Sequence, residues 1–325
     1  MHMMDALLST PVALTGVAGA VGLLAIAGKE IKEKDDTSII PLMGVLGAFV
    51  FAAQMINFAI PGTGSSGHVI GGVLLAAFLG PWAAFLTIAS VLIIQCLVFA
   101  DGGLLALGCN LINMGAMTTL VAYPLIYRPI VGDSKKTFRI AIGAILACLI
   151  GLELGSTLVT IETVLSGVSA LKFGQFFSAM ALIHIPIGIV EGLATAGVLA
   201  FVADKRPDLL NEHYKRSPNK KSIKKAVIWF GVTTIVLLCG FVWFASSNPD
   251  GLEWSMERVG GFPEIEESNT TTISILASKI SNSTSIMPEY ENPFSGIAGT
   301  LIVLLIIWCI SSWLIKKPKK NVQNR

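Results

Sequence analysis

Long runs of apolar residues, separated by short polar segments, account for most of the chain. A helix needs about 20 apolar residues to cross a hydrocarbon core of about 30 Å. Segments that reach or approach this length are 12–28, 39–60, 69–80, 82–100, 104–127, 140–163, 174–203, 226–246 and 295–315. The pattern therefore predicts an all-α polytopic membrane protein with about nine transmembrane helices. The least certain is 69–80, which is short and joined through Pro81 to the next segment.

Lysine and arginine orient the predicted helices. With the amino terminus outside, the inner segments are 29–38, the turn at Pro81, 128–139, 204–225 and the tail after 315. Together these hold 20 of the 23 basic residues, an excess typical of cytoplasmic loops. Treating 69–100 as one crossing would put 204–225 on the opposite side from 29–38. We therefore predict nine spans with the amino terminus outside.

Composition agrees with a membrane protein. Hydrophobic residues make up 53% and charged residues 14% of the 325, and the mean hydropathy is +0.73. These values exclude an ordinary soluble domain. The five cysteines lie in apolar runs without a Cys-x-x-Cys pair, so we expect buried free thiols.

The amino terminus carries the strongest chemical signal. With Met1 in place, its α-amine, the amide nitrogen of His2 and the His2 imidazole can bind one metal ion, closing a five-membered and a six-membered ring. Nitrogen donors in a square plane suit Ni(II) and Cu(II), and Co(II) can be accommodated. A signal peptide cleaved after 12–27 would remove His2, but the lysines follow that run and Asp5 precedes it, the reverse of a signal peptide. We expect Met1 to stay, because histidine is a large second residue.

The predicted topology puts His68 on the same outer side as His2. It ends the loop 61–68, and we expect it to be the fourth metal donor; the alternative is that it only stabilises a re-entrant turn. The loop contains Gly62-x-Gly64-x-x-Gly67, but it lacks the strand, the βαβ unit and the acidic residue of a dinucleotide fingerprint. We expect non-helical backbone at membrane depth, which marks a binding site.

Polar side chains in or near the apolar runs are candidates for supporting these ligands. The residues expected around the metal ligands are Asn57, Ser65, Ser66, Asn110 and Asn113; for the asparagines the alternative is hydrogen bonding between helices without a role at the metal. His184 and Glu191 lie two helical turns apart on one face, and we expect a structural pair, with a route for metal release as the alternative. The roles of Glu153 and Glu162 stay open.

Several motifs together resemble a known family. In the first part of the chain they are Met-His-Met-Met-Asp-Ala-Leu at 1–7, Gly-Ser-Ser-Gly-His-x-x-Gly-Gly at 64–72 and Asn-Leu-Ile-Asn-Met-Gly at 110–115. They resemble the substrate-binding component of energy-coupling-factor nickel/cobalt transporters, the NikM/CbiM family. The stretches 245–254 and 287–290, with their flanking spans, resemble its small accessory subunit, NikN/CbiN. The chain looks like a fusion of the two.

The resemblance implies a site and partners. In that family the first residue's amine, the second residue's amide and imidazole, and a loop histidine hold the metal, which correspond to Met1, His2 and His68. Ni(II) or Co(II) would be the transported substrate and no permanent cofactor is expected. The chain lacks a phosphate-binding Gly-x-x-x-x-Gly-Lys-Ser/Thr loop. A separate transmembrane coupling subunit and ATPase subunits are therefore implied, in a prokaryotic cell membrane. Nickel versus cobalt stays open, and the fusion slightly favours nickel.

The same resemblance divides the chain. A metal-binding transmembrane module would span 1–205, a basic cytoplasmic linker 206–225, and a two-span accessory module 226–325. We expect the outer loop 247–294 to be mobile or ordered only by contact with the first module. His213, in the linker, is expected to be solvated.

Other functions are weighed against this interpretation. An intramembrane metalloenzyme would need a pattern such as His-Glu-x-x-His, which four scattered histidines do not provide; we expect no enzyme. A self-sufficient secondary transporter would show internal repeats, and none is convincing. Besides the lipid bilayer and the transporter subunits we expect no partner, and no nucleic acid.

Overall fold

The computed structural model describes residues 1–34, 39–210, 220–260, 271–287 and 293–314. Helices dominate, and the described part contains one two-stranded antiparallel sheet. The longer helices are α1 (Thr10–Lys34), α2 (Ile40–Gln54), α3 (Gly72–Leu79), α4 (Pro81–Phe99), η3 (Leu111–Tyr127, π-helical), α7 (Thr137–Ser166), α8 (Phe173–Lys205), α9 (Lys220–Val236), α10 (Gly251–Val259), α11 (Thr272–Thr284) and α12 (Pro293–Leu314). Short helical segments are η1 (Asp5–Leu7), α5 (Leu107–Asn110), α6 (Arg128–Val131), η4 (Pro207–Leu209), η6 (Leu237–Phe241) and η7 (Val242–Phe244). The strands are β1 (Phe58–Ile60) and β2 (Ser65–Gly67).

Six of the described helices are long and apolar enough to cross a membrane: Thr10–Glu33, Pro81–Phe99, Leu107–Val131, Thr137–Ser166, Phe173–Lys205 and Lys221–Phe244. Ile40–Gln54 and Phe294–Ile310 are apolar but shorter. The predicted segment 69–80 contains only α3, whose eight residues rise about 12 Å at about 1.5 Å per residue. This segment therefore does not cross a core of about 30 Å by itself.

The chain reverses between α3 and α4. Gly80 has a φ of +78°, a conformation that glycine adopts without steric cost. Pro81 then takes the start of α4, where its missing N–H is no loss. Because α3 is less than half as long as α4, it begins partway along the bundle. The loop before it, which carries His68, therefore reaches into the protein.

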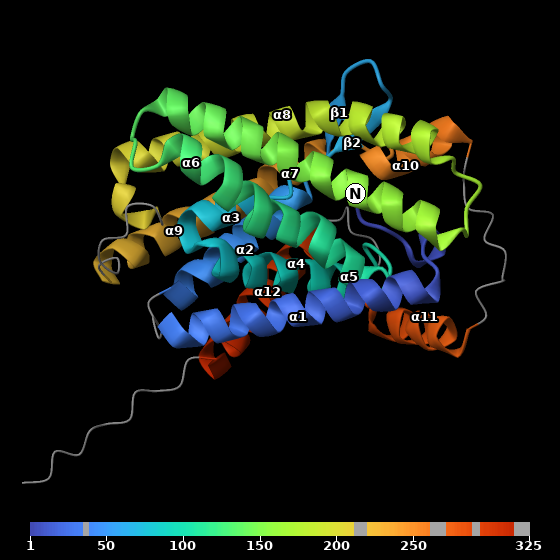
Figure 1. Ribbon diagram of the computed structural model, residues 1–325. Helices are drawn as coiled ribbons and strands as arrows, with labels where there is room; N and C mark the ends of the chain where they lie inside the picture. Colours follow the sequence, from blue (N-terminus) through green and yellow to red (C-terminus); the bar gives the residue numbers. More distant parts are fainter. Residues whose placement is uncertain (35–38, 211–219, 261–270, 288–292, 315–325) are drawn as a thin grey trace, which may run out of the picture.

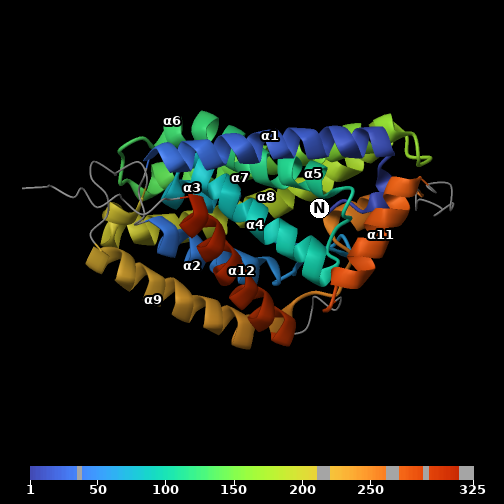
Figure 2. The ribbon, with the colours of Figure 1, turned by 90° about the horizontal axis from the view of Figure 1, so that it is seen from below.

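The helices form one elongated bundle with two different ends (Figure 1). The β-hairpin, α10 and α11 lie at one end, on the right of the view, and Met1 is buried on that side (Figure 2). The end of α1, the turn between α6 and α7, and the start of α9 lie at the other. The described parts of three basic segments that were predicted to be inside, 29–34, 128–139 and 220–225, thus lie at the end away from the hairpin.

The part of the chain after residue 220 packs directly on the part before residue 206. Helices α9 and α12 contact α2, α10 lies on α8 and β2, and α11 contacts α4. The described residues of 247–294 are therefore ordered in contact with the first module. Within that module α7 and α8 approach closely, because a Cβ at Gly192 would overlap the backbone of Ile145. Small residues commonly permit such approach between membrane helices.

Candidate metal-binding site

The first residues of the chain enter the bundle as extended backbone. Met1 is 5% exposed and Met3 is fully buried. Asn110 holds Met3 from both sides: the Met3 N–H donates to Asn110 Oδ1 at 2.8 Å, and Asn110 Nδ2 donates to the Met3 carbonyl at 3.1 Å. The Gly103 N–H donates to the same carbonyl at 2.9 Å. Buried non-helical backbone is tolerated here because its polar groups are paired.

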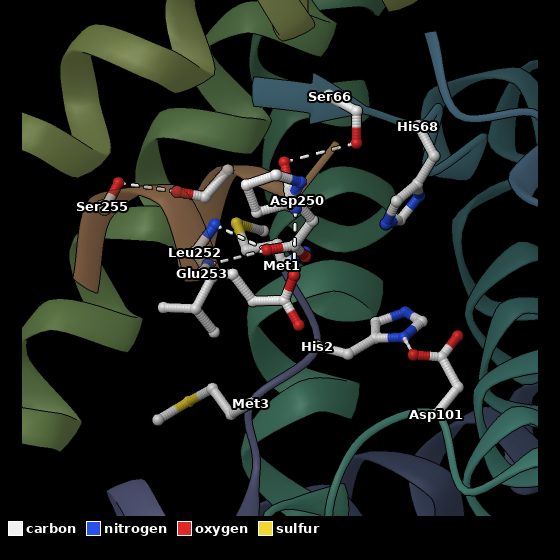
Figure 3. Close-up of polar contacts among 12 residues, drawn as sticks. Met1, His2, Met3, Ser66, His68, Asp101, Asp250, Leu252, Glu253 and Ser255 are labelled. Carbon is white, nitrogen blue, oxygen red and sulfur yellow. Dashed lines mark hydrogen bonds and ion pairs between the residues drawn. The ribbon is translucent and has the colours of Figure 1, made fainter. Parts of the chain in front are cut away.

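Asp101 holds the His2 ring. This aspartate follows α4, and its Oδ1 contacts Nδ1 of His2 (Figure 3). The next two residues let the loop approach so closely: Gly102 has a φ of +87°, and a Cβ at Gly103 would overlap the Asp5 carboxylate. The nearby His2 imidazole lowers the pKa of Asp101, although burial opposes the shift. Sequence reasoning missed Asp101; its signal was a lone acidic residue between an apolar run and two glycines.

His68 meets His2 across the site. The centroids of the two imidazole rings lie 5.4 Å apart, with their planes inclined by 59°. Nδ1 of His68 lies 3.2 Å from the Val69 carbonyl, and a carbonyl only accepts, so Nδ1 carries the proton and Nε2 keeps its lone pair. Burial, together with the positive amino terminus, lowers the pKa of His68 to about 4. The ring is therefore neutral at pH 7, as a metal ligand must be.

Three helices fix the backbone that follows His68. Glu191 on α8 accepts the N–H groups of Ile70 and Gly71, at 3.0 and 2.8 Å. Gln54 on α2 donates to the Ile70 carbonyl at 2.8 Å, and Gln95 on α4 donates to Gln54 at 2.7 Å. Both polar groups of the peptide unit between Ile70 and Gly71, and the N–H of Ile70, are thereby paired.

The segment 248–254, from the later part of the chain, covers the site and is called the covering segment. The Ser66 N–H and Oγ donate to the carbonyls of Pro249 and Asn248, both at 2.8 Å, and Ser65 Oγ donates to Pro249 at 3.2 Å. Trp254 Nε1 donates to the Thr63 carbonyl at 2.9 Å. Ser65 and Ser66 were predicted to surround the metal ligands, whereas their described contacts attach this covering segment to the β-hairpin.

Asp250 brings a second carboxylate to the amino terminus. Its Oδ2 accepts from the Met1 α-amine, while its Oδ1 accepts the N–H groups of Leu252 and Glu253 at 2.8 and 2.9 Å (Figure 3). The Asp250 N–H donates back to Glu253 at 3.2 Å, which completes a capping box at the start of α10. The positive amine and these hydrogen bonds outweigh burial and hold the pKa of Asp250 well below its usual range. Sequence reasoning also missed Asp250 as a site residue.

The remaining predicted residues have varied positions. Asn57 takes part through its main chain, accepting from the Ser246 N–H at 2.7 Å. Asn113 donates to Glu162 at 2.7 Å and lies 3.7 Å from the Met3 sulfur. Glu153 has a buried Oε1 without a hydrogen-bond partner among the described residues. His213 lies outside them.

His184 and Glu191 do not bond to each other in the contacts described. His184 Nδ1 lies 2.7 Å from the Met180 carbonyl of its own helix, and Glu191 binds the His68 loop. Both nevertheless face the same region. A small cavity there is lined by Met1, Gly67, His68, Ile70, Leu152, His184, Ile187, Asp250 and Gly251. Each of the two side chains thus has its own hydrogen-bond partners, and the structural pair stays a prediction.

The donor set fits a metal held partly by backbone. Among the described residues no group of three His, Cys, Asp or Glu side chains that could hold a metal ion is found. Nε2 of His2 is buried and has no hydrogen-bond partner among the residues that the structure describes. A six-membered ring with the His2 amide requires Nδ1, which faces Asp101 here. Closing that ring therefore requires the imidazole to turn so that Nδ1 leaves Asp101.

Comparison with known proteins identifies the family. The sequence model of the family described as "Cobalt uptake substrate-specific transmembrane region", CbiM, matches residues 2–209, and that of the PDGLE domain matches 224–317. In this chain Pro-Asp-Gly-Leu-Glu occupies 249–253, the segment that covers the site.

Similar proteins share both parts. A putative fused nickel transport protein NikMN of Archaeoglobus fulgidus is 32% identical over 308 residues, which are 91% of this chain and 95% of that protein. A fused nickel transport protein NikMN of Rhodobacter capsulatus is 30% identical, over 79% of this chain and 76% of that protein. A solved structure of a truncated transition metal transporter is 31% identical with a TM-score of 0.56, covering 63% of this chain and 99% of that one. The chain thus belongs to the CbiM family of metal transport proteins, joined to a PDGLE domain, and is a multi-pass protein of a prokaryotic cell membrane rather than an enzyme.

Proposed function

We propose that this chain captures nickel or cobalt ions for an ATP-driven energy-coupling-factor importer. The observation that carries the proposal is the meeting of the Met1 amine, His2 and His68 in one partly buried place, although 66 positions separate the two histidines. The Met1 amine, the His2 amide, the His2 imidazole and the His68 imidazole supply four nitrogen donors. Such a set suits Ni(II) and also Co(II).

The topology proposed is nine passes with the amino terminus outside, α3 and its preceding loop forming an incomplete one. The distribution of charge supports this orientation, because the described parts of the basic segments 29–34, 128–139 and 220–225 lie at the end of the bundle away from the hairpin. The metal ion would then be captured at the outer end. The division proposed is a metal-binding module at 1–205, a linker at 206–225 and an accessory module at 226–325.

A separate transmembrane coupling subunit and ATPase subunits would supply the energy. The absence of a phosphate-binding loop from the sequence supports this arrangement. The rival is a secondary transporter driven by a proton or sodium gradient. Purified chain in liposomes with an imposed gradient and no ATP distinguishes the two, since our proposal expects no accumulation of metal.

Titration with Ni(II) and with Co(II) tests the site. The native chain is compared with one that carries Gly-Ser ahead of Met1, with any purification tag at the other end. The extension displaces the α-amine from His2 and leaves every side chain unchanged. Loss of a direct ligand should exceed the 10- to 100-fold that supporting residues cost, so we expect affinity to fall more than about 100-fold. Equal affinity in the extended chain would show that the amine is not a metal ligand.

A further inference from the structure

The Met1 amine differs from the other proposed ligands in how it is held. It sits at a chain end, so backbone restrains it on one side only. Asp101 contacts Nδ1 of the His2 ring, a contact that must break when this nitrogen binds metal, and Glu191 and Gln54 bind the backbone of the His68 loop. The amine contacts Asp250, which comes from the second half of the chain, 249 positions away (Figure 3).

We infer that Asp250 is a positioning residue for the metal, holding the α-amine where the ion is bound. This inference rests on the proposed function, in which the amine is a ligand. It makes the metal site a product of both modules: the first supplies the donors, and the second sets the direction of one of them.

The carboxylate is itself oriented from two sides. Its Oδ1 is committed to the N–H groups of Leu252 and Glu253 at the start of α10, which leaves Oδ2 pointing to the amine. Gly251 packs closely against His184, since a Cβ added there would lie only 3.1 Å from Cε1 of His184, tighter than ordinary van der Waals contact. Ser66 fixes the residues just before it.

The same contact can persist when a metal is bound. A coordinated amine keeps two N–H groups, and one of them can continue to donate to Oδ2. Carboxylates commonly accept in this way from histidine ligands and orient them. The negative charge also opposes the cost of placing a cation in a partly buried site. Asp250 therefore favours the loaded state without being a ligand.

Asp250→Asn separates positioning from helix capping. Asparagine caps a helix about as well as aspartate, so α10 keeps its start, but the side chain now presents an amide N–H₂ to the amine. We expect Ni(II) affinity in the full chain to fall 10- to 100-fold. The absorption spectrum at saturating Ni(II) should stay that of the native chain, because the four nitrogen donors are unchanged.

Glu253→Ala is the matched control, since it removes the other arm of the capping box and leaves the amine contact. We expect its affinity within threefold of native. In the Gly-Ser extended chain, Asp250→Asn should have no further effect, because the amine has already been displaced.

Three results would overturn the inference: affinity of Asp250→Asn within threefold of native, an equal loss in Glu253→Ala, or a changed spectrum at saturation. Failure of the proposed function looks different. There the extended chain binds as tightly as the native one, whatever Asp250→Asn does.

Discussion

Two irregular segments meet at the site, and they are supported in different ways. The amino-terminal segment 1–9 is held by the neighbouring stretch 101–110 and by Asp250. The loop 61–71 is held by α2 and α8 and by hydrogen bonds to the covering segment. The first offers backbone nitrogens as well as an imidazole, whereas the second offers only an imidazole. The segment with more donors therefore has fewer independent supports.

The largest effect should come from removing a donor in either segment. We expect His2→Ala and His68→Ala each to abolish metal uptake by cells and to weaken Ni(II) binding more than about 100-fold, beyond the loss that supporting residues cause. His213→Ala is the control and should take up metal normally. Normal uptake by His2→Ala would show that the amino-terminal segment is not part of the site.

A smaller effect should come from loosening the amino-terminal segment. Asn110→Leu leaves the buried Met3 N–H without its acceptor, and the Met3 carbonyl keeps only Gly103. We expect Ni(II) affinity to fall about 10-fold or more, within the 10- to 100-fold range for supporting residues. Asn57→Ala, which keeps its main-chain contact, should bind like the native chain. Equal affinities in these two variants would mean that Asn110 does not order the segment.

The loop should resist a comparable change better. Glu191→Gln leaves one amide oxygen for two N–H donors, but Gln54 and the hairpin still hold the loop. We expect Ni(II) affinity to fall less than about 10-fold, below the lower bound for supporting residues. Thermal stability should fall too, because a buried donor without a partner costs about 1–3 kcal/mol.

Glu153→Gln is the control for Glu191→Gln, since it makes the same chemical change on α7 away from the loop. A greater loss of affinity in Glu191→Gln than in Asn110→Leu would reverse the comparison between the two segments.

The smallest effect concerns protonation of His68. Its pKa of about 4 keeps the ring neutral from pH 8 to pH 5, so protons do not compete with a metal ion for this ring in that range. We therefore expect the His68 ring carbons to show no NMR titration above about pH 5. A midpoint near 6.5 would show that the loop is open to solvent.

The lowered pKa of His68 also makes the stability of the fold depend on pH. Between pH 6.5 and about 4 the unfolded chain binds a proton at His68 and the folded chain does not. This group therefore makes the fold less stable as pH falls through that range.

The sequence by itself determined the features that depend on local composition. Hydrocarbon requires apolar residues in every crossing, so the helical membrane architecture could be predicted from the runs, and the family from its motifs. The bounds of the short α3 could not be predicted from the sequence. Pro81 joins two apolar runs, and the pattern does not say where a helix begins inside them. His2 and His68 could be singled out as candidates because histidine is rare in this chain, and the fold brings their rings together.

Tertiary structure alone decided which residues support those histidines. Asp101 and Asp250 reach the amino terminus from positions about 100 and 250 residues away, and no periodicity links such positions. Ser65 and Ser66 sit beside His68 in the sequence, yet their hydroxyls face the covering segment. Hydrogen-bond partners follow from which surfaces meet in space. The sequence therefore supplied the proposed donors, and the fold decided which residues surround them.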